Sequence, residues 1–251
     1  MIEGPGIIAF PTPIVNRQGR HMVNNWWNFI QFRLFPPTCI LCHRPGAGEL
    51  DLCAGCRAEL PRPGPACRRC AEPLASDAGW VCGRCQRRPP AFDRTLTLFR
   101  YASPVDRLIL DLKHHRRLAN ARLLGQLLHL AATDWPACDL LVPVPLHPRR
   151  QWRRGFNQSL EIARFAAHGL KLPLDSRRCR RLRCTDTQAE LSARARRANV
   201  RGAFRAEGDW RGRRVAIIDD VMTTGATADA LARALKARGA LEVQVWVCAR
   251  A

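Results

Sequence analysis

The sequence lacks any apolar run that approaches the ~18 residues of a membrane-spanning helix. Its first residues also lack the basic segment, the apolar segment and the small-residue cleavage site of a secretory signal. We therefore expect a cytoplasmic protein with no membrane span. Residues 1–22 are rich in glycine and proline and show no pattern, so we expect them to be disordered, with Met22 as an alternative native start.

Acidic residues are scarce, because 21 aspartates and glutamates stand against 41 lysines and arginines, for a net charge of +20. This excess predicts attraction to partners that carry phosphate groups. Arginines that replace lysines on solvated faces would give the same balance, so charge suggests nucleic acid without identifying it. With 251 residues and 47% hydrophobic content, the chain is long enough for one ordinary domain with a packed core and a smaller one.

Cysteine is abundant, and eight of the twelve cysteines form four CxxC pairs. Two residues between thiolates let a tight turn aim both sulfurs at one tetrahedral zinc ion, and gaps of 10 or 11 residues between successive pairs fit a ribbon hairpin. An interleaved pairing and a redox role for one CxxC are the alternatives. We expect two structural Zn2+ sites in sequential order, Cys39/Cys42/Cys53/Cys56 and Cys67/Cys70/Cys82/Cys85.

The segment before the first pair, residues 26–37, places Trp26, Phe29, Ile30 and Leu34 at helical spacing. A small metal module lacks a large core of its own, so we expect an amphipathic helix that lies on the ribbon; contact with a membrane surface is the alternative. The cysteines outside the pairs have no metal-site spacing, and we expect inert thiols at Cys138, Cys179, Cys184 and Cys248.

Pro89 and Pro90 indicate a linker after the last pair, because the pattern then changes to the alternating segment TLTLFRY. We expect a disordered start (1–22), a helix with a double zinc ribbon (23–90) and a second domain (91–251). Strands alternating with helices indicate a parallel α/β sheet in the second domain. The apolar spacing predicts helices at 103–116, 119–132, 157–168 and 226–238, and strands at TLTLFRY, 139–144, 214–218 and 243–249.

The stretch VAIIDDVMTTGAT, residues 215–227, carries the strongest functional signal. A strand over residues 215–218 would deliver Asp219 and Asp220 to the sheet edge, where loops feed helix N-termini with unsatisfied amides. Two carboxylates cannot hold a phosphate, but they suit hydroxyls or a metal beside it. The site therefore fits a sugar phosphate, with a phosphate-holding turn made of Thr223, Thr224, Gly225, Ala226 and Thr227.

This stretch resembles the phosphoribosyl-diphosphate (PRPP) signature of type I phosphoribosyltransferases. The resemblance implies that Asp219 and Asp220 hold the ribose hydroxyls and that the threonine turn holds the 5′-phosphate. Further motifs, LVPVPLHPRRQWRRGFNQSLEIA, RLRCTDTQAELSARARRAN, PPAFDR and the zinc module, resemble the ComF (ComF/GntX) family of competence-associated proteins. The implied fold is α/β: a type I phosphoribosyltransferase fold, a parallel sheet flanked by helices, preceded by a small double zinc-ribbon module.

Other site residues follow from the same comparison. A stiff loop of Pro143, Val144 and Pro145, followed by Arg149 and Arg150, lies where this fold cradles pyrophosphate, although a basic solvated turn would look the same. Residues 181–199 resemble the hood that closes over the reacting centre. Mg2+ would accompany PRPP, and arginines would stabilise the leaving charge. The expected catalytic residues are Asp219, Asp220, Arg183, Arg196 and Lys113, the last within LKHHRR, which departs from the family's usual LKYxG.

Residues 177–214 hold 13 arginines and four acids, and they are the best candidate surface for single-stranded DNA. Phe204 and Trp210 are the aromatic residues there, so phosphate contacts would dominate over base stacking. Three functions remain open: transfer of phosphoribosyl to an unidentified acceptor, handling of DNA in uptake or utilisation with uptake and recombination proteins as partners, and sensing of PRPP without turnover.

Overall fold

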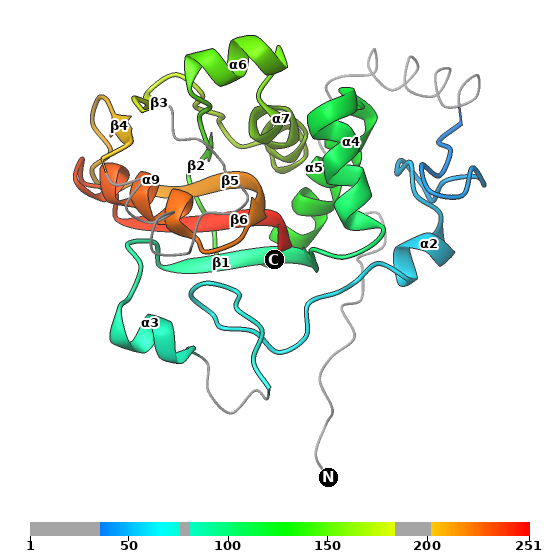
Figure 1. Cartoon of the computed structure of the whole chain (residues 1–251), viewed down its shortest axis with the longest axis horizontal. Coiled ribbons are helices and arrows are strands. Elements are labelled where there is room, and N and C mark those ends of the chain that lie inside the picture. The colour runs from blue at the N-terminus through cyan, green and yellow to red at the C-terminus, as the bar shows by residue number, and fades with distance from the viewer. Residues whose placement is uncertain (1–35, 76–80, 184–201) are drawn as a thin grey trace, which may run out of the picture.

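The computed structural model describes residues 36–75, 81–183 and 202–251. The expected helix at 26–37 and the expected disorder of residues 1–22 lie outside them, apart from two terminal helix positions that adopt no helical structure. At the centre is a four-stranded sheet in the order β1-β6-β5-β2 (Figure 1). Its strands are β1 (Arg94–Arg100), β2 (Leu140–Pro143), β5 (Arg214–Met222) and β6 (Glu242–Arg250).

All three strand pairs of this sheet are parallel, as predicted. Leu140 of β2 stands beside Val215 of β5, and Val215 stands beside Val243 of β6. Each strand reaches its neighbour through a crossover, so the carboxyl ends of all four strands meet at one edge of the sheet. This edge is where the segment with two acids arrives.

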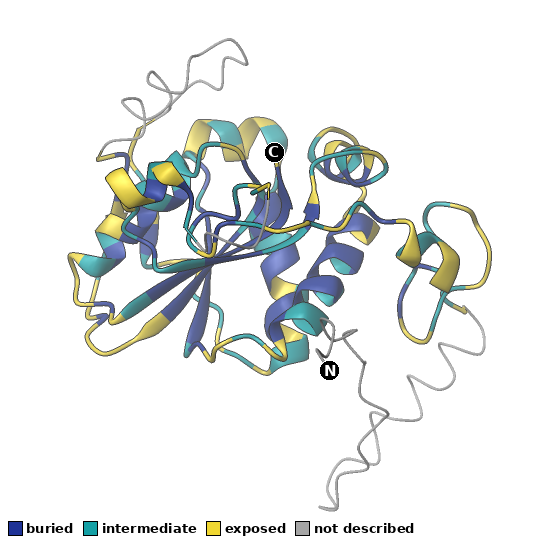
Figure 2. Cartoon of the chain, turned by 90° about the horizontal axis from the view of Figure 1, so that it is seen from below, coloured by how far each residue is buried: buried dark blue, intermediate teal, exposed yellow. Residues whose placement is uncertain are grey.

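Two hydrophobic cores cover the two faces of the sheet. Along β5, Ala216 and Ile218 pack into one core, while Val215 and Ile217 pack into the other. Because successive strand residues point to opposite faces, this alternation builds a layer of helices on each side. Figure 2 shows the buried residues concentrated in the strands and in the helix faces that cover them.

The first face is covered by α4 (Val105–His115), α5 (Leu118–Ala132) and α7 (Gln158–Leu170), and the second by α9 (Ala226–Lys236). These four helices agree with the predicted ones to within a few residues. The α5–α7 crossing is close because α5 presents a glycine: a Cβ at Gly125 would lie 2.5 Å from the carbonyl oxygen of Ile162. None of the described helices has both the length and the apolar character to cross a bilayer.

Three elements differ from the sequence prediction. The strand expected at 214–218 continues to Met222, so both acids lie within β5 and not beyond it. The arginine-rich segment after β2, expected as a loop, forms helix α6 (Pro148–Arg154). A separate two-stranded antiparallel sheet, β3 (Cys179–Arg181) with β4 (Phe204–Ala206), was not predicted.

The two cysteine ribbons join different hydrophobic cores, one on each side of the central sheet. The first ribbon, which holds Cys39 to Cys56, contains helix α2 (Ala54–Ala58) and joins the core of α4, α5 and α7 through Leu50 and Leu52. The second ribbon, which holds Cys67 to Cys85, contains helix α3 (Gly83–Arg87) and joins the core of α9. In Figure 1 the two ribbons accordingly stand at different places around the sheet.

The cysteines outside the ribbons are buried wherever the structure describes them, at Cys138, Cys179 and Cys248. Burial raises the pKa of Cys138 and of Cys179 to about 12 in each case. Thiols with such pKa values stay protonated near neutrality and are poor nucleophiles, which agrees with the predicted inert role. Cys184 lies outside the described residues.

Candidate functional site

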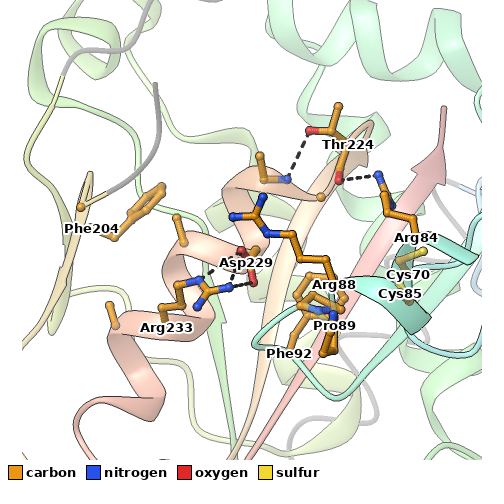
Figure 3. Close-up of a pocket in the computed structure, with 16 residues that line it drawn as sticks. Cys70, Arg84, Cys85, Arg88, Pro89, Phe92, Phe204, Thr224, Asp229 and Arg233 are labelled. Carbon is orange, nitrogen blue, oxygen red and sulfur yellow. Dashed lines mark hydrogen bonds and ion pairs between the residues drawn. The ribbon is translucent and has the colours of Figure 1, made fainter. Parts of the chain in front are cut away.

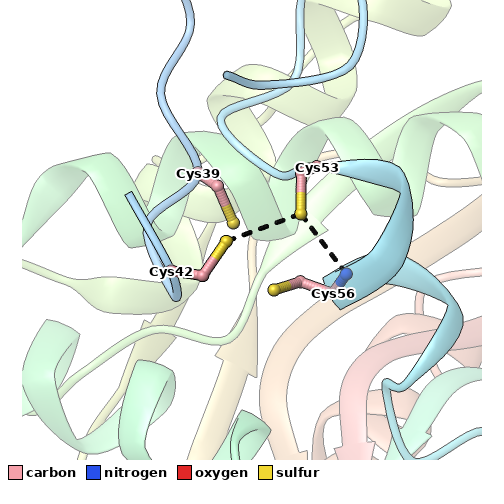
Figure 4. Close-up of side chains that lie close together, drawn as sticks. All are labelled: Cys39, Cys42, Cys53 and Cys56. Atoms are coloured by element: carbon pink, nitrogen blue, oxygen red, sulfur yellow. Dashed lines mark hydrogen bonds between the residues drawn. The ribbon is translucent and has the colours of Figure 1, made fainter. Parts of the chain in front are cut away.

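The eight paired cysteines gather into two groups of four, in the sequential order that we expected. Within each group the ligand atoms all lie within 4.8 Å of one another (Figure 4 shows the first group). The Sγ atoms of Cys42 and Cys53 are 3.6 Å apart, as are those of Cys70 and Cys82. Four sulfurs about 2.3 Å from a tetrahedral zinc ion stand about 3.8 Å from one another, so both groups fit zinc.

The two groups are built from the same turn. In each first CxxC pair, the amide of the leading cysteine donates to the residue five positions later, Cys39 to Arg44 and Cys67 to Glu72, both over 2.8 Å. The residue after the pair, His43 or Ala71, adopts a left-handed backbone. Four thiolates complete the coordination shell of a zinc ion and leave no position for water, so the donor sets are those of structural sites.

The paired acids occupy the carboxyl edge of the sheet, where α7 and α4 reach them. Asp219 is half-buried, and its Oδ1 accepts a hydrogen bond of 2.9 Å from Ser159 Oγ and one of 3.0 Å from the amide of Asp220. Ser159 lies in the first turn of α7, which is capped by the side chain of Asn157. The cap therefore sets the position from which Ser159 holds the acid.

Asp220 is 4% exposed and forms an ion pair with Lys113 in the last turn of α4. Arg154, at the end of α6, lies near the same carboxylate: burial lowers the pKa of Arg154, and the charge of Asp220 opposes that effect. Asp220 thus interacts with two positive charges, through an ion pair with Lys113 and at longer range with Arg154. This arrangement compensates a buried charge that would otherwise be costly.

The ionisation of Asp219 is unfavourable. Burial, followed by the neighbouring charge of Asp220, raises the pKa of Asp219 from 3.8 to about 8, although Ser159 and Lys113 act in the opposite direction. A carboxylate with this pKa is held in the fold at a cost to stability. Raised pKa values are common at sites that bind or react, since a ligand or a metal ion can relieve the cost.

The turn from β5 to α9, residues 223–225, follows the acids directly. Gly225 has a φ of 75°, a left-handed conformation, and caps the N-terminus of α9. The side chain of Thr224 accepts from the amide of Ala226 over 3.3 Å. The amides of Thr223 and Gly225 donate to none of the described residues, so this turn presents donors next to the positive end of a helix.

The proline loop meets the acids across the sheet edge. Pro143 pairs with Ile218, and the amide of Val144 donates to the carbonyl of Ile218 over 2.9 Å. The side chain of Asn157 donates to the carbonyl of Val144 over 3.0 Å, which ties this loop to the start of α7. The structure therefore brings together the proline loop, the two acids, Lys113 and the β5–α9 turn.

The remaining expected residues are not placed against the acids. Arg183 is exposed beyond the end of β3, and Arg196 lies outside the described residues, as does most of the expected hood at 181–199. Arg149 is exposed and Arg150 is half-buried in α6, and the roles of these four arginines stay predictions. Sequence reasoning missed Ser159 and Arg154, although both lie in the quoted motif LVPVPLHPRRQWRRGFNQSLEIA.

A cavity of about 950 Å3 lies on the other side of the β5–α9 turn, between the second ribbon and α9 (Figure 3). Arg84, Arg88 and Arg233 line it, together with Phe92 and Thr224, whereas the paired acids do not. Arg84 Nη1 donates to the carbonyl of Thr224 over 3.2 Å. The turn thus separates the acid site from this cavity, and the second ribbon contacts the turn across it.

Comparison with known proteins assigns both parts of the chain. A double zinc ribbon domain matches residues 31–86, and a phosphoribosyl transferase domain matches residues 157–251. The DNA utilization protein YhgH of Escherichia coli O157:H7 is 40% identical over 222 residues, which are 86% of this chain and 97% of that protein. Competence protein F of Haemophilus influenzae is 34% identical over 234 residues, 89% of this chain and 99% of that protein.

Among solved structures, the purine phosphoribosyltransferase from Pyrococcus horikoshii aligns with a TM-score of 0.30 and 17% identity. The alignment covers 62% of this chain and 87% of that chain. A likeness at this level adds nothing to the domain match. The parallel sheet flanked by helices and the two ribbons agree with the fold class predicted from the sequence.

Proposed function

The chain belongs to the ComF family, with the DNA utilization protein YhgH and competence protein F among its members, and from this premise we propose that it binds PRPP with Mg2+ at the carboxyl edge of its sheet. The observation that carries the proposal is the pair Asp219 and Asp220, directly followed by a turn with available amides at the start of α9. In this order, acceptors suited to a diol would stand beside donors suited to a phosphate.

The two acids hold each other in reach of one ligand. Asp219 Oδ1 accepts from Ser159, Asp220 Oδ2 pairs with Lys113, and the two acid side chains share a hydrogen bond that a bound hydroxyl or metal ion would replace. Carboxylate oxygens suit the ribose 2′ and 3′ hydroxyls and also Mg2+, which prefers oxygen ligands. The donor set therefore fits the group that the fold implies.

The anionic parts of PRPP find donors on either side of the acids. The 5′-phosphate would take the amides of the β5–α9 turn, and the pyrophosphate would lie along the loop of Pro143, Val144 and Pro145, near Arg154. Bound Mg2+ supplies charge neutralisation to the departing pyrophosphate. Lys113 pairs with Asp220 and orients its carboxylate, and the expected Arg183 and Arg196 would add positive charge.

Calorimetry tests the binding proposal. Asp219→Asn with Asp220→Asn should abolish Mg2+-dependent PRPP binding, because both diol acceptors and the charge for the metal are lost. The matched control is Glu59→Gln with Asp134→Asn, which removes the same charge from two exposed positions away from the sheet edge. Unchanged PRPP affinity in the first variant would remove the ligand assignment.

We propose that the chain also transfers the phosphoribosyl group to an acceptor. Release of pyrophosphate, measured over a panel of nucleobases with and without an oligonucleotide, tests this step. Release that depends on one acceptor identifies the substrate. Tight PRPP binding without release under all conditions contradicts catalysis and leaves the sensing role in its place.

A role in handling single-stranded DNA is the second candidate, and the exposed side chain of Trp152 favours it. Trp152 is 87% exposed in α6, between Arg150 and Arg153. By contrast, Phe204 and Trp210 are buried, with Arg181 and Arg178 over their rings, so the two aromatic residues of the arginine-rich segment 177–214 are not available to stack on a base. An exposed indole among arginines combines base stacking with phosphate contacts.

Fluorescence anisotropy with a labelled oligonucleotide tests this candidate. Trp152→Ala should weaken binding about tenfold, since stacking contributes about 1–3 kcal/mol per base, and Trp152→Phe should retain most of the affinity. Binding should also fall steeply with salt and should tolerate the Asp219 and Asp220 double change. Equal affinity of the Ala and Phe variants with the wild type would exclude α6 from the DNA surface.

A further inference from the structure

The second ribbon is joined to the β5–α9 turn by two arginines, and the first of them is Arg84. This residue lies in α3, next to Cys85, and its Nη1 donates to the carbonyl of Thr224 over 3.2 Å (Figure 3). The same guanidinium hydrogen-bonds the sulfur of Cys70 and stands 3.9 Å from the carboxylate of Glu72. One side chain therefore connects the cysteine site with the backbone of the turn.

The second arginine is Arg250, at the end of β6, which is 6% exposed. Its Nε donates to the carbonyl of Cys70, and its Nη1 donates to the carbonyl of Met222, both over 3.1 Å. Its Nη2 pairs with the carboxylate of Glu72. The carbonyl of Met222 also accepts from the amide of Ala251 over 3.0 Å, so β6 fixes its direction, whereas the carbonyl of Thr224 is held by Arg84 of the second ribbon.

These two contacts set the direction of the amides that face the ligand. In a trans peptide the carbonyl and the following N–H point in opposite directions. Holding the carbonyl of Met222 therefore aims the amide of Thr223 away from the ribbon, and holding the carbonyl of Thr224 does the same for Gly225. The cavity lies on the ribbon side of the turn, so the hydrogen bond from Arg84 reaches the turn beside a space that side chains do not fill.

The first ribbon has no such connection. Its contacts with the rest of the protein include Gln126 Nε2 to the carbonyl of Glu49 over 3.4 Å and Arg122 to Asp51 over 3.9 Å, both from α5. No hydrogen bond or ion pair joins it to residues 222–226 within the described part of the chain. The two cysteine sites therefore have the same ligands but different contacts, because the second ribbon contacts the β5–α9 turn and the first ribbon contacts α5.

We propose that Arg84 and the second cysteine site position the β5–α9 turn, so that metal occupancy of this site controls the affinity of the turn for a phosphoryl group. A ribbon without a core of its own loses its fold when the metal leaves, and the donors to the turn would be lost with it. The inference rests on the proposed PRPP site and assigns it a regulatory partner, the second ribbon.

The first test compares two arginines of the same short helix. Arg84→Ala removes the donor to Thr224, whereas Arg87→Ala removes an arginine of α3 that makes no hydrogen bond or ion pair with the described residues. With the full zinc-loaded chain, Arg84→Ala should speed hydrogen exchange of the hydrogen-bonded amides of Ala226 and Asp229 about tenfold and weaken PRPP binding about tenfold. Arg84→Lys should restore part of both effects, and Arg87→Ala should change neither.

The second test removes one ligand from each site. Cys85→Ser and Cys56→Ser should each cost one zinc ion by elemental analysis, but Cys85→Ser alone should speed exchange at the start of α9. Equal exchange in both variants, or in the two alanine variants, would overturn the proposal. If the wild type binds no PRPP, the proposed function fails, whereas the exchange measurements still decide whether the ribbon positions the turn.

Discussion

Because of Asp219, the stability of the protein should fall as the pH rises toward the alkaline range. The pKa of Asp219 rises from 3.8 to about 8 in the fold, since burial and Asp220 oppose its ionisation. Between these two values the unfolded chain has lost the proton that the folded chain keeps, so the free energy of unfolding falls as pH rises. Asp219→Asn removes this dependence, and its amide oxygen can still accept from Ser159.

The size of the effect follows from the two pKa values. Linkage gives an upper limit of about 2.5 kcal/mol for the additional loss of wild-type stability between about pH 6 and about pH 8.5. Water at the half-buried carboxylate reduces this figure, so we expect the Asn variant to gain about 1–2.5 kcal/mol on the wild type over the same interval.

Urea denaturation at both pH values, with zinc held constant, measures the difference between the two proteins. Effects of pH on the ribbons cancel in that difference because both proteins carry them. Asp134→Asn, at an exposed position, is the control and should follow the wild type. A gap between Asp219→Asn and the wild type that stays constant with pH would refute the reasoning, because Asp219 would then ionise as freely in the fold as in the unfolded chain.

Three further substitutions have defined outcomes. Lys113→Met leaves the buried carboxylate of Asp220 without its ion-pair partner, so it should lower the free energy of unfolding by about 3 kcal/mol in urea denaturation and weaken PRPP binding in calorimetry. Gly225→Ala forces an alanine into the left-handed region but meets no atom closer than 3.5 Å, so it should cost about 1 kcal/mol by the same denaturation assay. Gly125→Ala places a Cβ 2.5 Å from the carbonyl oxygen of Ile162, and the resulting separation of α5 and α7 should lower the stability by about 2 kcal/mol and the melting temperature with it.

Apolar periodicity sufficed to predict the sheet, its parallel strands and the four long helices. Val215 to Ile218 are all buried, and successive residues among them pack into alternate cores, which is the pattern that a covered parallel strand needs. Periodicity did not predict that β5 continues to Met222. Aspartate is rare in strands, and Asp219 and Asp220 remain in one because Ser159 and Lys113, distant in sequence, hold them.

Helix α6 was missed for a different reason. Its sequence, PRRQWRR, has no apolar stripe, so periodicity indicated a loop. Its ends carry recognisable signals: His147 caps the first turn by accepting from the amide of Arg149, Pro148 stands at the first helical position, and Gly155 is left-handed after the last. Capping residues would have found this helix where hydrophobicity could not.

The sequence motifs identified part of the proposed site. Carboxylates, threonines and the proline loop are adjacent in sequence to the strands that bring them together, so their meeting at one edge could be predicted. The link from Arg84 to the turn spans 140 residues. No local sequence pattern predicts a contact of this kind, because it depends on where the second ribbon packs against the rest of the chain.

Because each ribbon joins the core on a different side of the sheet, the two ribbons contribute to the packing of the second domain. Leu52 lies in the core beneath one layer of helices, and Cys82 and Cys85 of the second ribbon lie in the core beneath the other. Cutting the chain at Pro90, or grafting its sheet onto another leader, would strip cover from both layers at once. Such fragments should aggregate when expressed alone, because apolar surface on both sides of the sheet would be exposed to water.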